Sequence, residues 1–547
     1  MQRSSRRRAA WWGRLRALAT RAALLALALA ALTSTACRLE AQPISIPMRD
    51  GKSLAADLYL PLGVGPWPTI LLVTPYDKDP YRLRLPFAAE SYAWVIVDAR
   101  GLFGSVGAAN PDAAPGEDGY DCVEWIARQT WSDSHVGMWG PSALGVVQFQ
   151  TAREHPPHLD AGVPLVASFA TSYANYYPGG AMRLEYVASL SLADTPGIGA
   201  QVVLAHPAED SLWGQVEAQT QYGDELGVPM LVVGGWYDHR TEDLLASYRD
   251  LVTRGLGHAR AEHRLLIGPW EHDHVDEESV GALTFPNAAG VAAEASLAFF
   301  DKHLRGIEGG PSGGRARWFD TGLGEWRDGD EFPPAGGAAA TFHLGAGGVL
   351  TPAAPTAASS SSPLRYDPND PSPTIGGANF SGTVAAGPQD QAAVEARNDA
   401  LVFTSAPLAA DLRVAGTSRA VIFGASNRTD TDLVVRLTDV HPDGTSMLVT
   451  DGARKGRFAS GTAPEDEALL APGTVYSFAI DLPSIAITFR AGHRVRVVVT
   501  SSNYPRFYAN RNDGGVLYDP DAPYKLANNT VFHDSKHLSR LILPLAP

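Results

Sequence analysis

The sequence predicts an α/β domain with a doubly wound, mostly parallel sheet, followed by a C-terminal all-β domain of the jelly-roll type. Between residues 43 and 308, short apolar runs alternate with longer mixed segments, which is typical of strands that alternate with helices. After residue 309 the helical periodicity disappears, and β-type runs separated by turn residues replace it. These two observations predict the fold class and the boundary between the two domains.

The apolar runs of the first domain are mostly continuous rather than alternating. Strands buried on both faces have this pattern, so helices are expected to cover both sides of the sheet. The expected strands are residues 55–60, 69–73, 93–97, 136–139, 230–233 and 264–267, and the expected helices are residues 120–129, 146–153 and 242–253.

The second domain is expected to be antiparallel. Turn sequences such as Pro442-Asp443-Gly444 and Arg490-Ala491-Gly492 separate its apolar runs, and no helix-length pattern lies between them. The expected strands include residues 420–423, 432–437, 476–480 and 494–499.

Composition excludes several classes of protein. The chain has 547 residues, of which 45% are hydrophobic, enough for large cores. Its formal net charge of -15 would repel a polyphosphate backbone, so we expect no nucleic-acid partner. With only two cysteines, Cys37 and Cys122, the chain has no disulfide framework and no cysteine-based zinc site.

The first 36 residues are expected to be a secretory signal. Arginines precede the apolar stretch Ala22 to Leu32, and Ser34-Thr35-Ala36 then supplies the small residues of a cleavage site. The apolar stretch spans about 17 Å as a helix, too short for a hydrocarbon core of about 30 Å, although a membrane anchor or a core helix is the alternative. We therefore expect export, to the periplasm or the medium, or as a lipoprotein anchored at Cys37, with no membrane span in the mature chain.

Ser142 is the candidate nucleophile. It lies in Gly140-Pro141-Ser142-Ala143-Leu144-Gly145, between an expected strand and an expected helix. A serine among small residues on such a turn is presented above the sheet edge, over the N-terminus of the helix. The glycines lie two residues before and three after the serine, so the stricter five-residue motif is absent, and a Gly-Ser turn without chemistry is the alternative.

A serine hydroxyl needs a base, and the base needs an orienting acid. Asp238 and His272 each lie just past the carboxyl end of an apolar run, where active sites of open α/β sheets assemble. The order serine, aspartate, histidine is that of α/β-hydrolases. His263 and His274 are the rivals for the base.

Tyr76 follows the run 69–73, in Pro75-Tyr76-Asp77-Lys78. From this position a phenol could reach the oxyanion that forms on a substrate, beside the backbone N–H of Ala143.

These residues resemble the CocE/NonD serine hydrolases, a family that includes cocaine esterase, α-amino-acid ester hydrolases and glutaryl acylases and is related to X-Pro dipeptidyl peptidases. The resemblance covers nearly all of the mature chain. Its motifs are Met48-Arg49-Asp50-Gly51, Pro75-Tyr76-Asp77-Lys78, Asp98-Ala99-Arg100-Gly101, Phe300-Asp301-Lys302-His303-Leu304-Arg305-Gly306, Tyr366-Asp367-Pro368, Gly492-His493-Arg494 and Ser501-Ser502-Asn503-Tyr504-Pro505-Arg506.

The resemblance implies an α/β-hydrolase domain at residues 43–308 and, at 309–547, a β-sandwich like the C-terminal domain of X-Pro dipeptidyl peptidases. It implies Ser142 as nucleophile, His272 as base and Asp238 as orienting acid, with Tyr76 and the Ala143 N–H as oxyanion donors. Family members usually carry tyrosine where this chain has Ala143. The cap, about residues 171–225, is expected to be short; its aromatic residues could pack a small helical lid or wall a pocket, and they are Tyr173, Tyr176, Tyr177, Tyr186, Trp213 and Tyr222.

We therefore expect a serine hydrolase that cleaves an ester or amide of a small molecule through an acyl-enzyme, without a metal or an organic cofactor. One alternative is an X-Pro dipeptidyl peptidase or acylase that acts on amides. A peptidase of this kind needs an acidic anchor for a free N-terminus, and Glu185 and Glu217 are candidates. The other alternative is an exported binding module whose hydrolase site is idle.

Overall fold

The computed structural model describes residues 41–83, 92–190, 199–308, 314–380 and 384–547. The expected signal segment, residues 1–36, and Cys37 lie outside these described ranges. Within them, no helix has both the length and the apolar character needed to cross a membrane.

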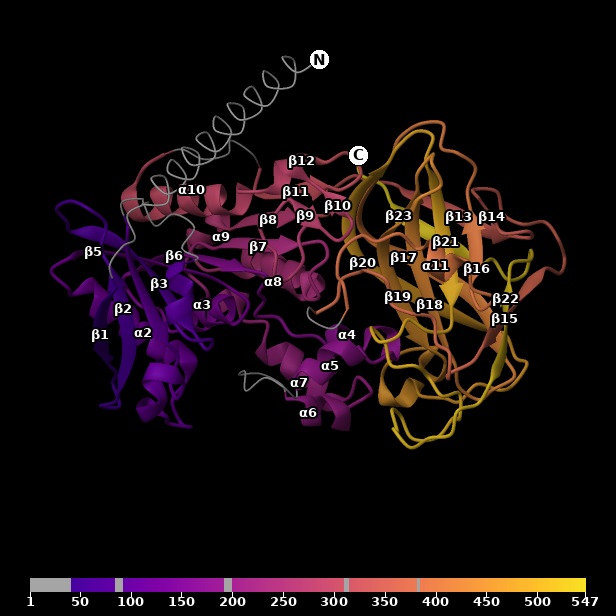
Figure 1. Cartoon of the computed structure of the whole chain (residues 1–547), viewed down its shortest axis with the longest axis horizontal. Coiled ribbons are helices and arrows are strands. Elements are labelled where there is room, and N and C mark those ends of the chain that lie inside the picture. The colour runs from indigo at the N-terminus through magenta and orange to yellow at the C-terminus, as the bar shows by residue number, and fades with distance from the viewer. Residues whose placement is uncertain (1–40, 84–91, 191–198, 309–313, 381–383) are drawn as a thin grey trace, which may run out of the picture.

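The first domain is built on a ten-stranded, mostly parallel sheet (Figure 1). The strand order is β1-β2-β4-β3-β5-β6-β7-β8-β11-β12, and every pair from β4 to β11 is parallel. The strands are β1 (Gln42–Pro47), β2 (Ser53–Tyr59), β3 (Trp67–Thr74), β4 (Ala93–Asp98), β5 (Ser132–Pro141), β6 (Leu159–Leu165), β7 (Leu231–Gly235), β8 (Arg264–Gly268), β11 (Ala316–Asp320) and β12 (Glu325–Gly329).

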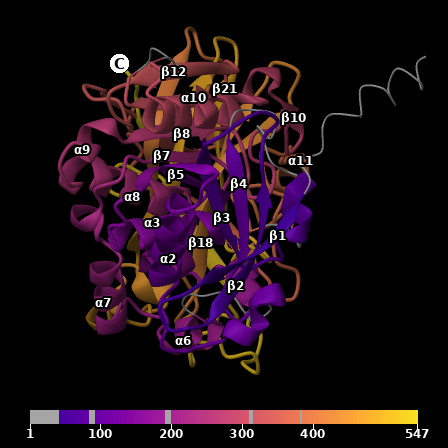
Figure 2. The same cartoon turned by 90° about the vertical axis from the view of Figure 1, so that its left-hand side faces the viewer.

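Helices cover both faces of this sheet, as the continuous apolar runs predict. A side chain at Gly137 of β5 would collide with Phe300 of α10, whereas one at Gly162 of β6 would approach Gln148 of α3. Gly162 pairs with Met138, the neighbour of Gly137, so α3 and α10 lie on opposite faces. Figure 2 shows α2 beside α3. The helices are α2 (Pro115–Ala127), α3 (Ala143–Arg153), α8 (Thr241–Arg254), α9 (Ala259–Glu262) and α10 (Val291–Arg305).

The sheet continues past residue 308, the end of the first domain predicted from the sequence. β11 pairs in parallel with β8, and β12 pairs antiparallel with β11. The two strands form a hairpin at the edge of the sheet, and a hairpin needs no crossover helix. The sequence after residue 309 has no helical pattern for this reason, although it still contributes to the first sheet.

The segment of the chain that connects β6 to β7 forms a small helical cap (Figure 1). Its core is aromatic: Trp213 is fully buried and contacts Tyr173, Tyr176 and Tyr177 at ring-centroid distances of 5.6, 5.3 and 6.4 Å. Most of the aromatic side chains of this segment therefore pack the lid. The described helices of the cap are α4 (Tyr173–Tyr176), α5 (Leu184–Leu190), α6 (Ala200–Ala205) and α7 (Ser211–Gln219).

The C-terminal domain is a largely antiparallel β structure, as predicted. Its strand order is β15-β22-β17-β23-β13-β14-β16-β21-β18-β19, with β20 paired to β17. The elements are β13 (Ala339–Gly345), β14 (Val349–Thr351), β15 (Ser361–Tyr366), α11 (Ala392–Glu395), β16 (Leu401–Thr404), β17 (Leu412–Ser426), β18 (Asp432–Val440), β19 (Ser446–Lys455), β20 (Tyr476–Phe489), β21 (Arg494–Thr500), β22 (Ala527–Phe532) and β23 (Arg540–Pro544); the hairpin β9 (Ser279–Val280) and β10 (Leu283–Thr284) precedes α10.

Polar contacts join the two domains around β20. Thr488 donates its backbone N–H and its hydroxyl to Asp320 of β11, at 2.8 and 2.5 Å. The Ser484 N–H donates to Glu242 of α8 at 2.5 Å. These contacts fix the C-terminal domain against β11 and against α8, the helix that follows Asp238.

Candidate active site

Ser142 lies on a tight turn between β5 and α3. Its backbone is at φ 55° and ψ -123°, a conformation that a residue with a side chain rarely adopts, and it is held there by the Ser142 N–H bond to the Leu165 carbonyl at 2.9 Å. The Ser142 carbonyl accepts the N–H groups of Gly145 and Val146, so the serine also begins the helix. This is the strand-to-helix elbow that the sequence predicts.

Gly145 permits the turn because the loop after β6 passes directly over it. A Cβ at this position would lie 2.5 Å from the Cβ of Ala167 and 3.1 Å from the Gly140 carbonyl oxygen. The small residues around Ser142 therefore serve close packing of the elbow against the 165–170 loop.

Asp238 and His272 follow the adjacent parallel strands β7 and β8, so they reach the same edge of the sheet. The Tyr237 N–H donates to the Trp270 carbonyl at 3.0 Å, which ties the two loops together. Gly235 lets them approach, since a Cβ there would lie 2.2 Å from the Trp270 carbonyl oxygen.

The three predicted residues meet in one chain of hydrogen bonds. His272 Nε2 lies 3.0 Å from Ser142 Oγ, and His272 Nδ1 lies 2.9 Å from Asp238 Oδ1. With the proton on Nδ1, His272 donates to the carboxylate and accepts from the serine hydroxyl. Burial raises the pKa of Asp238. The neighbouring His272 and His239 lower it by a larger amount, so the pKa lies below its usual value. Asp238 is therefore ionised and holds the imidazole in place.

Tyr76 is fixed by the loop after β3. The Tyr76 N–H donates to Thr74 Oγ1 at 3.0 Å, and the Lys78 N–H donates to Asp98 at 2.8 Å. Burial raises the pKa of the Tyr76 phenol, while a hydrogen bond with Ser142 acts in the opposite direction. The phenol thus reaches the nucleophile and stays protonated as a donor.

Ala143 is the first residue of α3. The first N–H groups of a helix have no acceptor within it, so this amide is free to face an oxyanion beside Tyr76. The sequence predicts this donor, and its side chain is small enough to line a cavity.

The rival histidines lie elsewhere. His263 is fully buried, and its Nδ1 accepts the Met230 N–H at 3.2 Å. His274 is half-exposed and contacts Glu271 at 2.9 Å. Neither contacts Ser142, so the structure brings only His272 to the nucleophile.

Two further residues, His239 and Phe380, contact the triad, and the sequence does not predict them. His239 Nδ1 lies 2.8 Å from Asp238 Oδ1, the oxygen that His272 also contacts. Phe380, from the C-terminal domain, packs against both rings at centroid distances of 4.8 and 5.6 Å. The position of His239 next to Asp238 in the sequence is the one signal that could have marked it, whereas nothing in the sequence places Phe380 here.

Both candidate ammonium anchors make contacts within the cap. Glu185 is buried and forms an ion pair with Arg183 at 2.8 Å, and Glu217 accepts the Tyr173 N–H at 2.9 Å. The second oxygen of Glu185, Oε2, is buried without a hydrogen-bond partner.

A cavity of about 1210 Å³ adjoins the elbow. It lies between the hydrolase domain and the cap, and Ala143, Ser168, Phe169, Tyr176, Tyr222 and Arg240 are among its lining residues. Tyr176 thus lines the pocket as well as packing the lid, whereas Tyr222 lines the pocket and packs against Phe169 of the main core.

Among the residues that the structure describes, two groups of side chains have spacings that could hold a metal ion: Asp238, His239 and His272, and, in the C-terminal domain, Asp439, His441 and His493. In the first group, His272 is already hydrogen-bonded to Ser142. In the second, His493 Nδ1 lies within hydrogen-bond distance of Asp439 Oδ2, at 2.9 Å. Acyl transfer by a serine, histidine and aspartate requires no metal.

A serine at a strand-to-helix elbow, hydrogen-bonded to a histidine that an aspartate orients, defines a serine hydrolase of the α/β class. Residues 50–197 and 195–274 match the X-Pro dipeptidyl-peptidase (S15) family, and residues 311–542 match the X-Pro dipeptidyl-peptidase C-terminal non-catalytic domain. Cocaine esterase of Rhodococcus sp. strain MB1 Bresler is 32% identical over 575 residues, covering 92% of this chain and 98% of the esterase. The chain belongs to the CocE/NonD hydrolases of the S15 family, which confirms the resemblance seen in its motifs.

Solved structures share the fold over nearly the whole chain. An aminopeptidase from a marine sediment Thaumarchaeota archaeon aligns with a TM-score of 0.81 and 24% identity, covering 93% of this chain and 97% of the aminopeptidase. An α-amino-acid ester hydrolase aligns with a TM-score of 0.79 and 24% identity over the same shares. The two-domain architecture is therefore that of known hydrolases.

Proposed function

We propose that this hydrolase cleaves carboxylic esters, with Ser142 as nucleophile, His272 as general base and Asp238 as the acid that orients it. The observation that carries the proposal is the pair of contacts at His272, 3.0 Å to Ser142 and 2.9 Å to Asp238. His272 is 34 positions from Asp238 and 130 positions from Ser142 in the sequence, and the fold itself does not require these side chains to meet in this order. The assembled site therefore argues against an idle binding module.

The reaction follows from the geometry. Ser142 Oγ bonds to the ester carbonyl carbon while its proton passes to His272 Nε2, and the Tyr76 phenol and the Ala143 N–H hold the oxyanion. The C–O bond to the alcohol then breaks, and the alcohol leaves with the proton from His272. Water next attacks the acyl-enzyme and gives a proton to His272. The acid leaves as Ser142 regains that proton.

The charges of the site favour esters over peptides with a free N-terminus. An ammonium group needs a carboxylate, and Glu185 is already paired with Arg183 within the cap. The cavity beside Ala143 is lined by Arg240, whose positive charge would repel an ammonium group bound next to it, whereas the carboxylates that line it, Asp118 and Glu154, belong to α2 and the end of α3 rather than to the cap. The X-Pro dipeptidyl-peptidase alternative therefore has less support than the esterase.

The test is pre-steady-state hydrolysis of p-nitrophenyl esters. The purified chain should release a burst of p-nitrophenol equal to the enzyme concentration. Ser142→Ala should lose the burst and about 10⁴- to 10⁶-fold in kcat while its circular dichroism stays unchanged. Turnover of an Xaa-Pro-anilide faster than of simple esters would favour the peptidase, and undiminished turnover by Ser142→Ala would refute the triad.

We also propose that the protein is exported. The support is sequence pattern alone: an arginine-rich start, an eleven-residue apolar stretch from Ala22 to Leu32, and small residues before Cys37. The mature N-terminus, determined by mass spectrometry of the protein from a bacterial host, should fall near Ala36 or Cys37. A fatty-acyl mass on Cys37 would indicate a lipoprotein, and an intact Met1 terminus would contradict export.

A further inference from the structure

Arg240 is held beside the triad by its place in the chain. It lies two residues after Asp238, immediately before α8, and its backbone N–H donates to Asp238 Oδ1 at 3.3 Å. Its guanidinium donates to Ser168 Oγ through Nη2 at 2.9 Å and through Nε at 3.3 Å, and Nη1 lies 3.4 Å from the Tyr186 hydroxyl. The side chain is therefore directed toward the loop after β6.

That loop is the one that packs on the nucleophile elbow. Leu165 accepts the Ser142 N–H, and Ala167 lies against Gly145. Ser168 follows directly and lines the cavity together with Arg240 and Ala143. The Arg240 guanidinium and the nucleophile thus contact the same short loop, and the lining of one cavity includes both Arg240 and Ala143, the residue that follows the nucleophile.

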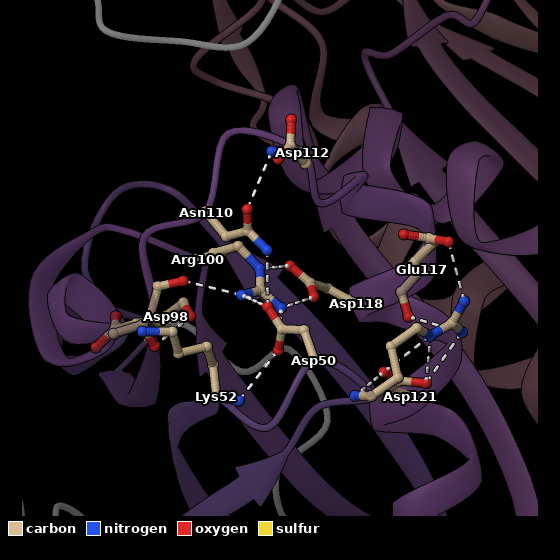
Figure 3. A network of polar contacts seen from close by, with 12 residues as sticks. Asp50, Lys52, Asp98, Arg100, Asn110, Asp112, Glu117, Asp118 and Asp121 are labelled. Carbon is tan, nitrogen blue, oxygen red and sulfur yellow. Dashed lines mark hydrogen bonds and ion pairs between the residues drawn. The ribbon is translucent and has the colours of Figure 1, made fainter.

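Of the described residues, three arginines line this cavity, and Arg240 differs from the other two. Arg100 is held by Asp118 at 2.6 Å and Asp50 at 2.8 Å, in the network that Figure 3 shows. Arg153 is held by Glu225 at 2.5 Å. Within the described ranges of the chain, Arg240 has no carboxylate partner of this kind; its hydrogen bonds go to two hydroxyl groups.

The charge of Arg240 is nevertheless maintained. Burial lowers its pKa, but Tyr186, Tyr176, Asp243 and Asp238 raise it above the usual value. Asp243 hydrogen-bonds Ser172 at 2.6 Å and contributes through its field rather than by contact with Arg240. A guanidinium carries more N–H donors than its contacts with Ser168 and Tyr186 use, so donors remain for a ligand.

We propose that Arg240 is a specificity-determining residue that binds a carboxylate on the acyl chain of the substrate, so that the preferred substrates are esters of dicarboxylic acids. This inference rests on the proposed esterase function and names its substrate class. The ester carbonyl would face Tyr76 and the Ala143 N–H, and the acyl chain would enter the cavity beside the Ala143 side chain. Its distal carboxylate would then meet Arg240 in a charge-assisted hydrogen bond.

The test compares two esters that differ by one charge: mono-p-nitrophenyl adipate and its methyl ester, methyl p-nitrophenyl adipate. The measured quantity is the ratio of kcat/KM for the acid to kcat/KM for the methyl ester. We expect the unmodified chain to favour the acid by about tenfold or more, and Arg240→Gln to lower the ratio by about 10- to 100-fold, mostly through KM. Arg240→Lys should retain part of the preference, because it keeps the charge but loses the planar fork.

The double variant Arg153→Gln/Glu225→Gln is the matched control, since it removes an ion pair at the same cavity without changing the net charge; it should leave the ratio unchanged. An Arg240 with a purely structural role would lower both rates together and keep the ratio, which would overturn the proposal. A ratio near one in the unmodified chain would also overturn it while leaving the esterase function intact. Failure to hydrolyse either ester, with no fluorophosphonate adduct on Ser142, would refute the esterase function and this inference with it.

Discussion

His239 packs edge-on against His272, with ring centroids 4.6 Å apart and an interplanar angle of 67°. Both rings also contact Asp238 Oδ1, His239 at 2.8 Å and His272 at 2.9 Å. Burial lowers the pKa of His239 to about 3, although the charge of Asp238 acts in the opposite direction. His239 is therefore neutral at the pH where the enzyme works, and it shares with His272 the oxygen that orients the base.

This arrangement predicts a shift in the pH profile. The contact with His239 lowers the pKa of Asp238. The variant His239→Phe removes this contact, so the Asp238 carboxylate should interact more strongly with His272. The imidazolium would then be better stabilised, and the acidic limb of kcat/KM should move to higher pH by about half a unit. The measurement is kcat/KM for p-nitrophenyl acetate from pH 5 to 9.

His239→Asn is the control for that experiment. An asparagine can place an N–H donor near the position of Nδ1 but loses the ring that packs on His272 and Phe380. The acidic limb should stay within about 0.2 unit of the parent. Equal shifts in both variants would mean that ring packing, rather than the contact with Asp238, sets the profile.

Tyr76→Phe should lower kcat by about 10²- to 10³-fold, the usual loss for one oxyanion donor. Tyr76 is 44% exposed, so deleting its hydroxyl should leave the melting temperature nearly unchanged. Because burial raises the pKa of this phenol, it remains a donor over the working range and adds no alkaline limb. An unchanged kcat would show that the Ala143 N–H holds the oxyanion without Tyr76.

The buried His263 predicts acid sensitivity of the first domain. Burial lowers its pKa to about 3 from 6.5, and its Nδ1 must stay unprotonated to accept the Met230 N–H. The unfolded chain therefore binds a proton that the folded chain does not, and stability falls as the pH drops below 6.5. Between pH 7 and pH 5 this costs about 2 kcal/mol in the free energy of unfolding.

His263→Asn keeps an acceptor near Nδ1 but does not titrate. In urea unfolding followed at the two pH values, the variant should lose about 2 kcal/mol less than the parent. Equal losses would mean that other buried groups, and not His263, set the acid sensitivity.

Much of the fold could be predicted because its strands are buried on both faces. β3 and β4 are continuous apolar runs, and polar residues mark the points where β7 and β8 end. β6 is missed because Asp160, Gly162 and Pro164 interrupt its pattern. Gly162 is small to admit Met230, the residue just before β7, a contact between segments far apart in the sequence.

Some residues of the site could likewise be predicted from the sequence, and others could not. Ser142, Asp238 and His272 could be found because each follows a strand and the topology alone brings strand ends to one edge. Phe380 and Arg240 could not be assigned a role from the sequence. Phe380 reaches the triad from the C-terminal domain, and the guanidinium of Arg240 is placed by Ser168 of the 165–170 loop. Such contacts between distant segments leave no periodic pattern in the sequence.

The activation of Ser142 by His272 can be measured directly with a fluorophosphonate probe, using tandem mass spectrometry to locate the adduct. The triad predicts one adduct per chain on Ser142, none in Ser142→Ala, and a labelling rate at least about 10³-fold lower in His272→Gln. Labelling of Ser142→Ala to the same extent, or of His272→Gln at the parental rate, would contradict the account.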